Sequence, residues 1–322
     1  MNISSECCVF QTPRLNQVMP PVLVLEVVLG LSGNSVALLM FMYHMDKWRP
    51  SAVFLTQLAV ADTMVLFCLP FRAHYYWQGK DWVLGDAACR VLLFLLAANR
   101  AAGIFFLTAV TVDRYCKIVH PLNRINLLGA GYAVGVSVFL WAVVLLATGH
   151  LLAEQQFLSS DNRMQCESFN ICMGPNALST WHSVFFVVHF VLPTAIVAFC
   201  TVRITWQLCS RPAGHRRKIK RAVHFVLAVA LVFIVCFLPS SASRIAIWVL
   251  KVWYQHCRYF EGANLAFYTS ICLTYFHSVL NPLVYYFATP AFSGIFRKLW
   301  DKLLRREAAA RRTVYVLQGV RL

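Results

Sequence analysis

Long apolar stretches alternate with short polar connectors along the chain. Each stretch is long enough to cross a bilayer, which takes about 20 helical residues, and the approximate cores are residues 21–43, 51–75, 87–112, 131–153, 181–208, 222–250 and 263–287. None of the connectors has the size or the apolar content of a second domain. The pattern therefore predicts an all-α membrane protein, with a bundle of seven transmembrane helices over residues 21–287.

The segments that flank this bundle are short. Residues 1–20 contain no signal-peptide core, so we expect an extracellular N-terminus and a first span that acts as its own insertion signal. Apolar and basic residues at helical spacing predict an amphipathic juxtamembrane helix over residues 288–304, followed by a short basic cytoplasmic tail over residues 305–322. After Ser293 the only Ser or Thr is Thr313, so we expect weak arrestin binding.

Composition and charge agree with this topology. Hydrophobic residues make up 59% of the chain and charged residues only 13%, whereas soluble domains carry about a quarter charged residues. The net charge of +16 is sorted by side: 20 of the 29 Lys and Arg residues fall in segments that would be cytosolic, six on the outer face and three inside spans. By the positive-inside rule this predicts a multi-pass protein of the cell membrane with its N-terminus outside. The sorting favours the lipid bilayer over nucleic acid as a partner.

Half of the twelve cysteines fall on the predicted outer face. They are Cys7, Cys8, Cys89, Cys166, Cys172 and Cys257. An even number of cysteines in an oxidising compartment predicts three disulfides, although six cysteines allow 15 pairings. The triplet Asn2-Ile3-Ser4 on the same face is a candidate glycosylation site.

Five motifs occur in order, each on its own span. They are Gly33-Asn34, Leu58-Ala59-Val60-Ala61-Asp62, Asp113-Arg114-Tyr115, Cys236-Phe237-Leu238-Pro239 and Asn281-Pro282-Leu283-Val284-Tyr285. With these motifs the chain resembles a class A (rhodopsin-like) G-protein-coupled receptor along nearly its whole length. Within that family it is most similar to the hydroxycarboxylic acid receptors and the oxoeicosanoid receptor. That likeness rests on Val18-Met19-Pro20-Pro21, Cys68-Leu69-Pro70-Phe71-Arg72, Asn99-Arg100, Cys166-Glu167-Ser168-Phe169 and Thr274-Tyr275.

The resemblance implies a disulfide pattern and a signalling partner. It pairs Cys89 with Cys166, and it pairs Cys7 and Cys8 with Cys172 and Cys257 in an order that it leaves open. It also implies coupling to heterotrimeric G proteins of the inhibitory class.

Three arginines lie inside predicted spans, where a charge costs at least about 2.5–3.5 kcal/mol and marks a functional site by default. The helical rise puts Arg72, Arg100 and Arg244 in the outer half of the membrane, and spans 2, 3, 5, 6 and 7 contain no acidic residue at their level. We therefore expect a carboxylate ligand, anchored by Arg100 through a bidentate contact.

The other candidate site residues surround this anchor. We expect Ser168 and Tyr275 to donate to the ligand, Arg72 and Arg244 to contact or attract it, and Glu167 to orient one of these arginines. The resemblance supports this set, because the hydroxycarboxylic acid receptors use an arginine matching Arg100. The alternative interpretation of Arg72 and Arg244 is that they extend to the outer membrane interface.

The remaining motifs form the expected activation switch. Its residues are Asp113, Arg114, Tyr115, Phe237, Pro239, Asn281, Pro282 and Tyr285. We expect Asp113 to pair with Arg114 in the inactive state. Between Glu167 and Glu261 there is no Asp or Glu that could complete a lock between helices, which predicts basal activity. The resemblance also implies a sodium ion at Asp62, but Gly103 and His277 depart from the family pattern and weaken that expectation.

Other functions are less well supported. The chain has none of the common enzyme motifs, such as His-Glu-x-x-His or a P-loop, and span 7 has no lysine for retinal, so we expect a receptor without a cofactor rather than an enzyme. The main alternative ligand is an oxidised long-chain fatty acid, for which Phe185, Phe186 and Phe190 offer apolar lining. A membrane carboxylate transporter is a more distant alternative, because the sequence shows no repeated halves.

Overall fold

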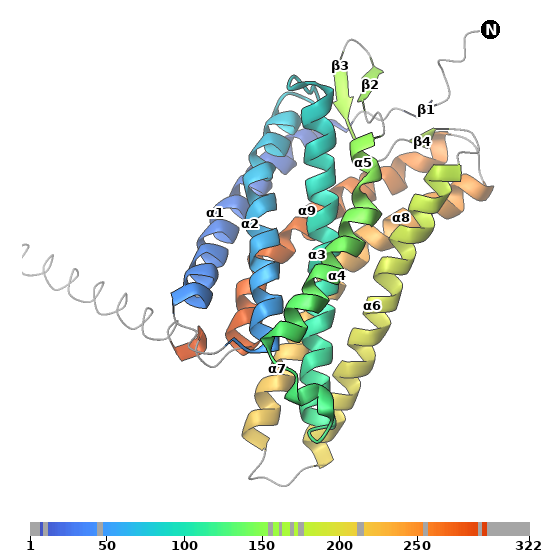
Figure 1. Cartoon of the computed structure of the whole chain (residues 1–322). Coiled ribbons are helices and arrows are strands. Elements are labelled where there is room, and N and C mark those ends of the chain that lie inside the picture. Colours follow the sequence, from blue (N-terminus) through green and yellow to red (C-terminus); the bar gives the residue numbers. More distant parts are fainter. Residues whose placement is uncertain are drawn as a thin grey trace, which may run out of the picture.

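The computed structural model of the protein describes residues 7–8, 12–43, 48–153, 157–160, 163–167, 171–172, 177–210, 216–253, 257–288 and 292–294. Within these ranges the chain is a bundle of long helices with two small antiparallel sheets. Figure 1 shows the strands together at one end of the bundle and the adjoining ends of α6 and α7 at the other.

The long helices match the predicted spans and extend beyond most of their apolar cores. Their bounds are α1 (Pro13–Tyr43), α2 (Pro50–Trp77), α3 (Gly85–Val119), α4 (Ala130–Thr148), α6 (Ala177–Ser210), α7 (Arg216–Val232), α8 (Leu238–Trp253) and α9 (Cys257–Ala288). The short helices are η1 (Arg124–Leu127) and α5 (His150–Ala153). Helix α1 begins at Pro13, within the predicted N-terminal segment, since proline suits the first turn of a helix.

The sixth span contains an irregular turn. A π-helical segment, η3 (Phe233–Phe237), joins α7 to α8, and Pro239 follows directly in the first turn of α8. A π turn relieves the clash that a proline ring makes with the preceding turn of an α-helix. This segment therefore sets how the outer half of the span is rotated relative to its inner half.

Six of the described spans, with α7 to α8 taken as one, are long and apolar enough to cross a membrane. The seventh predicted span is α9, whose apolar character is lowered by buried polar residues: Asn264, Ser270, Thr274, His277, Ser278 and Asn281. These side chains point into the bundle, where α9 packs against α1 and α8. The outer surface is apolar instead, as Val28, Phe139 and Val202 illustrate, which suits contact with lipid.

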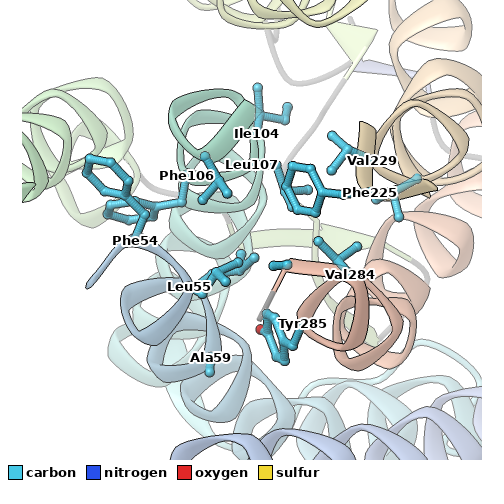
Figure 2. Packing of buried hydrophobic residues seen from close by; sticks show 14 of the residues in the cluster. Phe54, Leu55, Ala59, Ile104, Phe106, Leu107, Phe225, Val229, Val284 and Tyr285 are labelled. Carbon is cyan, nitrogen blue, oxygen red and sulfur yellow. The ribbon is translucent and has the colours of Figure 1, made fainter. Parts of the chain in front are cut away.

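Two buried apolar clusters fill the bundle, one in each half. Figure 2 shows part of the inner cluster, in which Leu55 and Ala59, Ile104 and Leu107, Phe225 and Val229, and Val284 meet from four different helices. Helices α1 and α9 approach each other closely because Gly33 has no side chain. A Cβ atom there would lie 2.5 Å from Cγ of Pro282.

The strands form the outer lid. Strands β2 (Phe157–Ser160) and β3 (Arg163–Cys166) make a hairpin that pairs Phe157 with Cys166. Strand β1 (Cys7–Cys8) pairs with β4 (Ile171–Cys172), with Cys7 opposite Cys172. Residues 7–8 thus lie beside residues 171–172.

Candidate functional site

The disulfide between Cys89 and Cys166 is present and joins the start of α3 to the end of β3, as expected. The side chains of Cys7, Cys8, Cys172 and Cys257 lie outside the described part of the structure, so their pairing stays a prediction. The register of β1 and β4 places Cys7 and Cys172 opposite each other, which is compatible with one of the two open orders. Asn2, Ser168 and most of the predicted juxtamembrane helix also lie outside the described residues.

Arg100 is buried in the outer half of α3 and is held by neutral groups. Its guanidinium donates to the hydroxyls of Ser240 at 2.5 Å, Ser241 at 2.7 Å and Thr274 at 3.3 Å. Its Nε–H is buried and has no hydrogen-bond partner among the described residues. No carboxylate of the described residues lies within ion-pair distance of this guanidinium. A buried cation without a counter-ion favours the binding of an anion.

Arg72 lies one level further out and is 1% exposed. It donates to the backbone carbonyl of Cys166 at 2.7 Å and to the hydroxyl of Tyr76 at 3.2 Å. Its guanidinium also lies 4.9 Å from the ring centroid of Tyr75 and 5.0 Å from that of Tyr76. Arg72 therefore faces inward and does not extend to the membrane interface.

Arg244 and Arg100 share one aromatic neighbour. The Cζ atoms of Arg100 and Arg244 lie 4.5 and 5.1 Å from the ring centroid of Phe186 on α6. The two guanidinium groups therefore cannot be farther apart than the sum of these distances, and they interact as like charges. Arg72, Arg100 and Arg244, here called the arginine cluster, concentrate positive charge in the outer half of the bundle.

Tyr275 lies between members of the arginine cluster. Its side chain is 5% exposed, and it interacts electrostatically with both Arg72 and Arg100. The phenol hydroxyl thus offers a neutral hydrogen-bonding group near Arg72 of α2 and Arg100 of α3.

Glu167 does not orient an arginine through an ion pair, contrary to expectation. Its Oε1 atom lies 3.3 Å from Nζ of Lys80 and accepts a hydrogen bond of 3.0 Å from the hydroxyl of Tyr75. The Cys166 carbonyl, one residue before Glu167, accepts a hydrogen bond from Arg72 instead. Because Lys80 neutralises Glu167, the arginine cluster keeps its positive charge.

The Asp62 carboxylate is enclosed by donors at the middle of the bundle. It accepts hydrogen bonds from Asn99 at 3.2 Å, Ser278 at 2.9 Å and Asn281 at 2.6 Å. Nε2 of His277 lies 3.3 Å from the same carboxylate.

These residues do not fit a sodium ion at Asp62. The imidazole of His277 fills the space beside Gly103, where a Cβ atom would lie 2.9 Å from Nε2. Hard cations prefer oxygen acceptors, whereas Asn99, Ser278 and Asn281 turn N–H and O–H groups toward this carboxylate.

At the inner face Asp113 and Arg114 have separate partners. Asp113 binds the hydroxyl of Ser51 and the ammonium of Lys117, with both contacts at 2.7 Å. Arg114 instead donates to the carbonyl of Ala288 at 2.6 Å, at the carboxyl end of α9. This structure therefore does not contain the pairing that we expect in the inactive state: Lys117 one turn later competes for the carboxylate, and the end of α9 offers an unpaired carbonyl.

The other switch residues lie in the bundle core or near its inner face. Tyr285 donates to Asn34 at 3.2 Å, while Tyr115 contacts His120 and Phe199. Phe237 is fully buried, with Pro239 following it in α8 and Pro282 inside α9.

Sequence reasoning missed four residues of this site: Lys80, Ser240, Ser241 and Thr274. The serines follow the Cys-Phe-Leu-Pro motif directly, at the end of the apolar run from Phe225 to Pro239. Their position directly after the motif could have indicated that they contribute to the site. Lys80 gave no such indication, because its burial depends on a left-handed turn after α2.

Comparison with known proteins agrees with this architecture. The family profile of the 7 transmembrane receptor (rhodopsin family) matches residues 33–285. Hydroxycarboxylic acid receptor 2 of Rattus norvegicus is 43% identical, over 94% of this chain and 83% of its own length. Hydroxycarboxylic acid receptor 1 of Homo sapiens is 40% identical, over 92% and 84%. Oxoeicosanoid receptor 1 of Homo sapiens is 37% identical, over 84% and 69%.

The profile match covers most of the chain, including all five motifs. Members of this family are receptors of the plasma membrane with several spans, which bind small molecules and couple to G proteins. The chain belongs to the rhodopsin family of seven-transmembrane receptors.

Proposed function

We propose that this receptor is activated by a carboxylate metabolite of the hydroxycarboxylic acid class and signals through inhibitory G proteins to lower cAMP. The observation that carries the proposal is the Arg100 guanidinium, which is buried among three hydroxyl groups without a carboxylate partner in the described residues. A ligand carboxylate supplies the missing negative charge and accepts from the guanidinium in a planar, charge-assisted contact.

The ligand is held by more than one group in this proposal. Arg100 is the anchor, and Arg72, Arg244, Tyr275 and Ser168 contact the ligand or draw it inward. A compact hydroxy acid suits a site in which Arg100 and Arg244 lie over the same aromatic ring, since one small molecule then meets more than one positive charge. The names of the relatives point to the same ligand class.

Orientation and partners complete the proposal. The N-terminus is extracellular, because that orientation puts most Lys and Arg residues in the cytosol. Inhibitory coupling is proposed by likeness to the hydroxycarboxylic acid receptors. Arrestin binding is weak, because the tail offers few sites for phosphorylation.

A second candidate ligand is an oxidised long-chain fatty acid. Phe186 beside Arg100, together with Phe190 on the same helix, offers apolar surface next to the anchor. Two relatives carry names of this kind, oxoeicosanoid receptor 1 and the 12-(S)-hydroxy-5,8,10,14-eicosatetraenoic acid receptor. Arg244 favours the smaller acid, since it adds a second cation close to the anchor.

The test is a cAMP assay in cells, with and without pertussis toxin, that compares lactate, 3-hydroxybutyrate, nicotinate and an oxoeicosanoid. We expect a toxin-sensitive fall in cAMP with a hydroxy acid and loss of that response in Arg100→Ala at equal surface expression. Arg90→Ala is the matched control, because Arg90 is a cation on the same helix that pairs with Asp86. An unchanged response in Arg100→Ala contradicts the anchor role, and uptake of labelled carboxylate without a cAMP response would indicate a transporter.

A further inference from the structure

Lys80 is a buried cation outside the arginine cluster. Its side chain is almost fully enclosed, and its Nζ atom lies 3.3 Å from Oε1 of Glu167 and 5.0 Å from the ring centroid of Tyr268. Lysines are almost never fully buried unless they are paired. The position of Lys80 therefore depends on its contact with Glu167.

The backbone after α2 is built to hold Lys80 there. Gly79 and Lys80 both have φ angles of 67°, and the Lys80 amide donates to the carbonyl of Tyr75 at 3.0 Å. A left-handed lysine is uncommon and requires support from its surroundings. The next two residues supply it, because Asp81 and Trp82 both hydrogen-bond to the backbone of Met164 in the lid hairpin.

This turn places one carboxylate between two sets of cations. The Cys166 carbonyl accepts from Arg72, and the next residue, Glu167, turns its carboxylate to Lys80 and Tyr75. Glu167 still interacts electrostatically with Arg72. A small rotation of the Glu167 side chain would therefore bring its carboxylate toward the arginine cluster.

We propose that Lys80 is a positioning residue that holds the Glu167 carboxylate away from the arginine cluster and so leaves the cluster free for the ligand carboxylate. This inference rests on the proposed function, because it assumes a carboxylate ligand. Without Lys80, Glu167 retains the neutral hydroxyl groups of Tyr75 and Tyr268 as hydrogen-bond partners, and the charged guanidinium of Arg72 is the stronger partner. An internal carboxylate that turns to the cluster competes with the ligand for the same charge.

The experiment is a double-mutant cycle on Lys80 and Glu167, read by binding of a labelled carboxylate agonist to membranes and by the cAMP response. We expect Lys80→Gln to weaken agonist binding about tenfold and Lys80→Arg to bind like the wild type. Glu167→Gln introduced into Lys80→Gln should restore binding, since the competing charge is gone. Arg90→Gln is the control for loss of a cation on the outer face.

A merely structural ion pair gives a different pattern. Glu167→Gln alone would then be as harmful as Lys80→Gln, and the double variant would bind no better than either single variant. That pattern overturns the inference. If Lys80→Gln fails to reach the cell surface, the Glu167→Gln variant decides alone. The inference expects this variant to bind the agonist at least as tightly as the wild type. A clear loss of affinity in this variant contradicts the inference.

Failure of the proposed function looks different again. In that case the wild-type receptor responds to no carboxylate, and both conclusions fall together. If the wild type responds, the cycle tests the role of Lys80 alone.

Discussion

The Cζ atom of Arg100 lies 5.8 Å from the ring centroid of Phe237, so the candidate anchor touches the switch residue of the sixth span. The ring of Phe237 also lies next to His277, with their ring centroids 5.0 Å apart. His277 in turn contacts Asp62. One buried aromatic side chain thus connects the proposed ligand site to the polar centre of the bundle. We infer that an anion at Arg100 changes the position of this ring.

This arrangement predicts that Phe237→Leu separates binding from signalling. Leucine keeps the site apolar but lacks the ring face that meets Arg100 and His277. We expect agonist affinity to stay near that of the wild type and the maximal cAMP response to fall by about half or more, because a ring–cation contact contributes about 0.5–2 kcal/mol. An agonist binding curve beside a dose–response curve measures both quantities, and a parallel loss of the two would contradict the idea.

Ser241→Ala should weaken agonist binding by removing a hydroxyl that positions the Arg100 guanidinium. Hydrogen bonds to charged groups contribute about 1.5–3 kcal/mol, so we expect a loss of about tenfold or more in agonist affinity. Ser243→Ala is the matched control, since its hydroxyl bonds to Pro239 and Ser270 instead. Equal losses in the two variants would argue for a general effect on α8.

Lys117→Met should lower basal activity. In the wild type Lys117 forms an ion pair with the Asp113 carboxylate, and Arg114 binds the end of α9 instead. Without the ammonium, Asp113 becomes free to pair with Arg114 and hold it. The measurement is ligand-free cAMP inhibition at equal surface expression, with Lys117→Arg as the control that keeps the charge. The prediction loses its basis if the wild-type receptor shows no more basal signalling than cells without receptor.

The thermal stability of the purified receptor should not depend on sodium. His277 fills the space beside Gly103, so exchanging NaCl for KCl should leave the Tm unchanged. Gly103→Ser alone should destabilise the receptor by about 1–3 kcal/mol, because its Cβ atom would meet His277. Adding His277→Asn should relieve this clash and introduce an oxygen ligand. A Tm of the wild type that rises with sodium but not with potassium would show that the ion binds despite the imidazole.

Gly33→Ala should destabilise the receptor through the contact between α1 and α9. The added methyl group would lie 2.5 Å from Cγ of Pro282, and overpacking of this kind costs about 1–3 kcal/mol. Gly135→Ala is the control, because a Cβ atom there meets nothing within 4 Å. The Tm in detergent is the measurement, and similar values for both variants would mean that α1 shifts to accept the methyl group.

The spans and the arginine cluster could be predicted from the sequence because they depend on local quantities. The length of each apolar stretch predicts a membrane-spanning helix. The helical rise per residue predicts how deep Arg100 lies in the membrane. The partners of Arg100 could not be predicted in this way. Ser240 is 140 residues away in the chain, and its direction depends on the irregular turn at Phe233–Phe237.

Contacts to the backbone were also beyond sequence reasoning. The Arg72 contact with the Cys166 carbonyl and the Arg114 contact with the Ala288 carbonyl involve an atom that every residue has. Residue type therefore carries no information about them. The Lys80 contact with Glu167 depends in turn on a positive φ angle at a residue that rarely adopts one.

The π-helical turn in the sixth span has a consequence for the direction of the side chains that follow it. Each residue of an α-helix advances the direction of the side chains by about 100°, and a π turn holds one residue more than an α-turn, so winding the same residues Phe233–Phe237 as a regular α-helix would change the rotational phase of everything that follows. Ser240, Ser241 and Arg244 would then face other neighbours. The chemistry of the outer half thus depends on the backbone conformation of a segment that contributes no polar side chain to it.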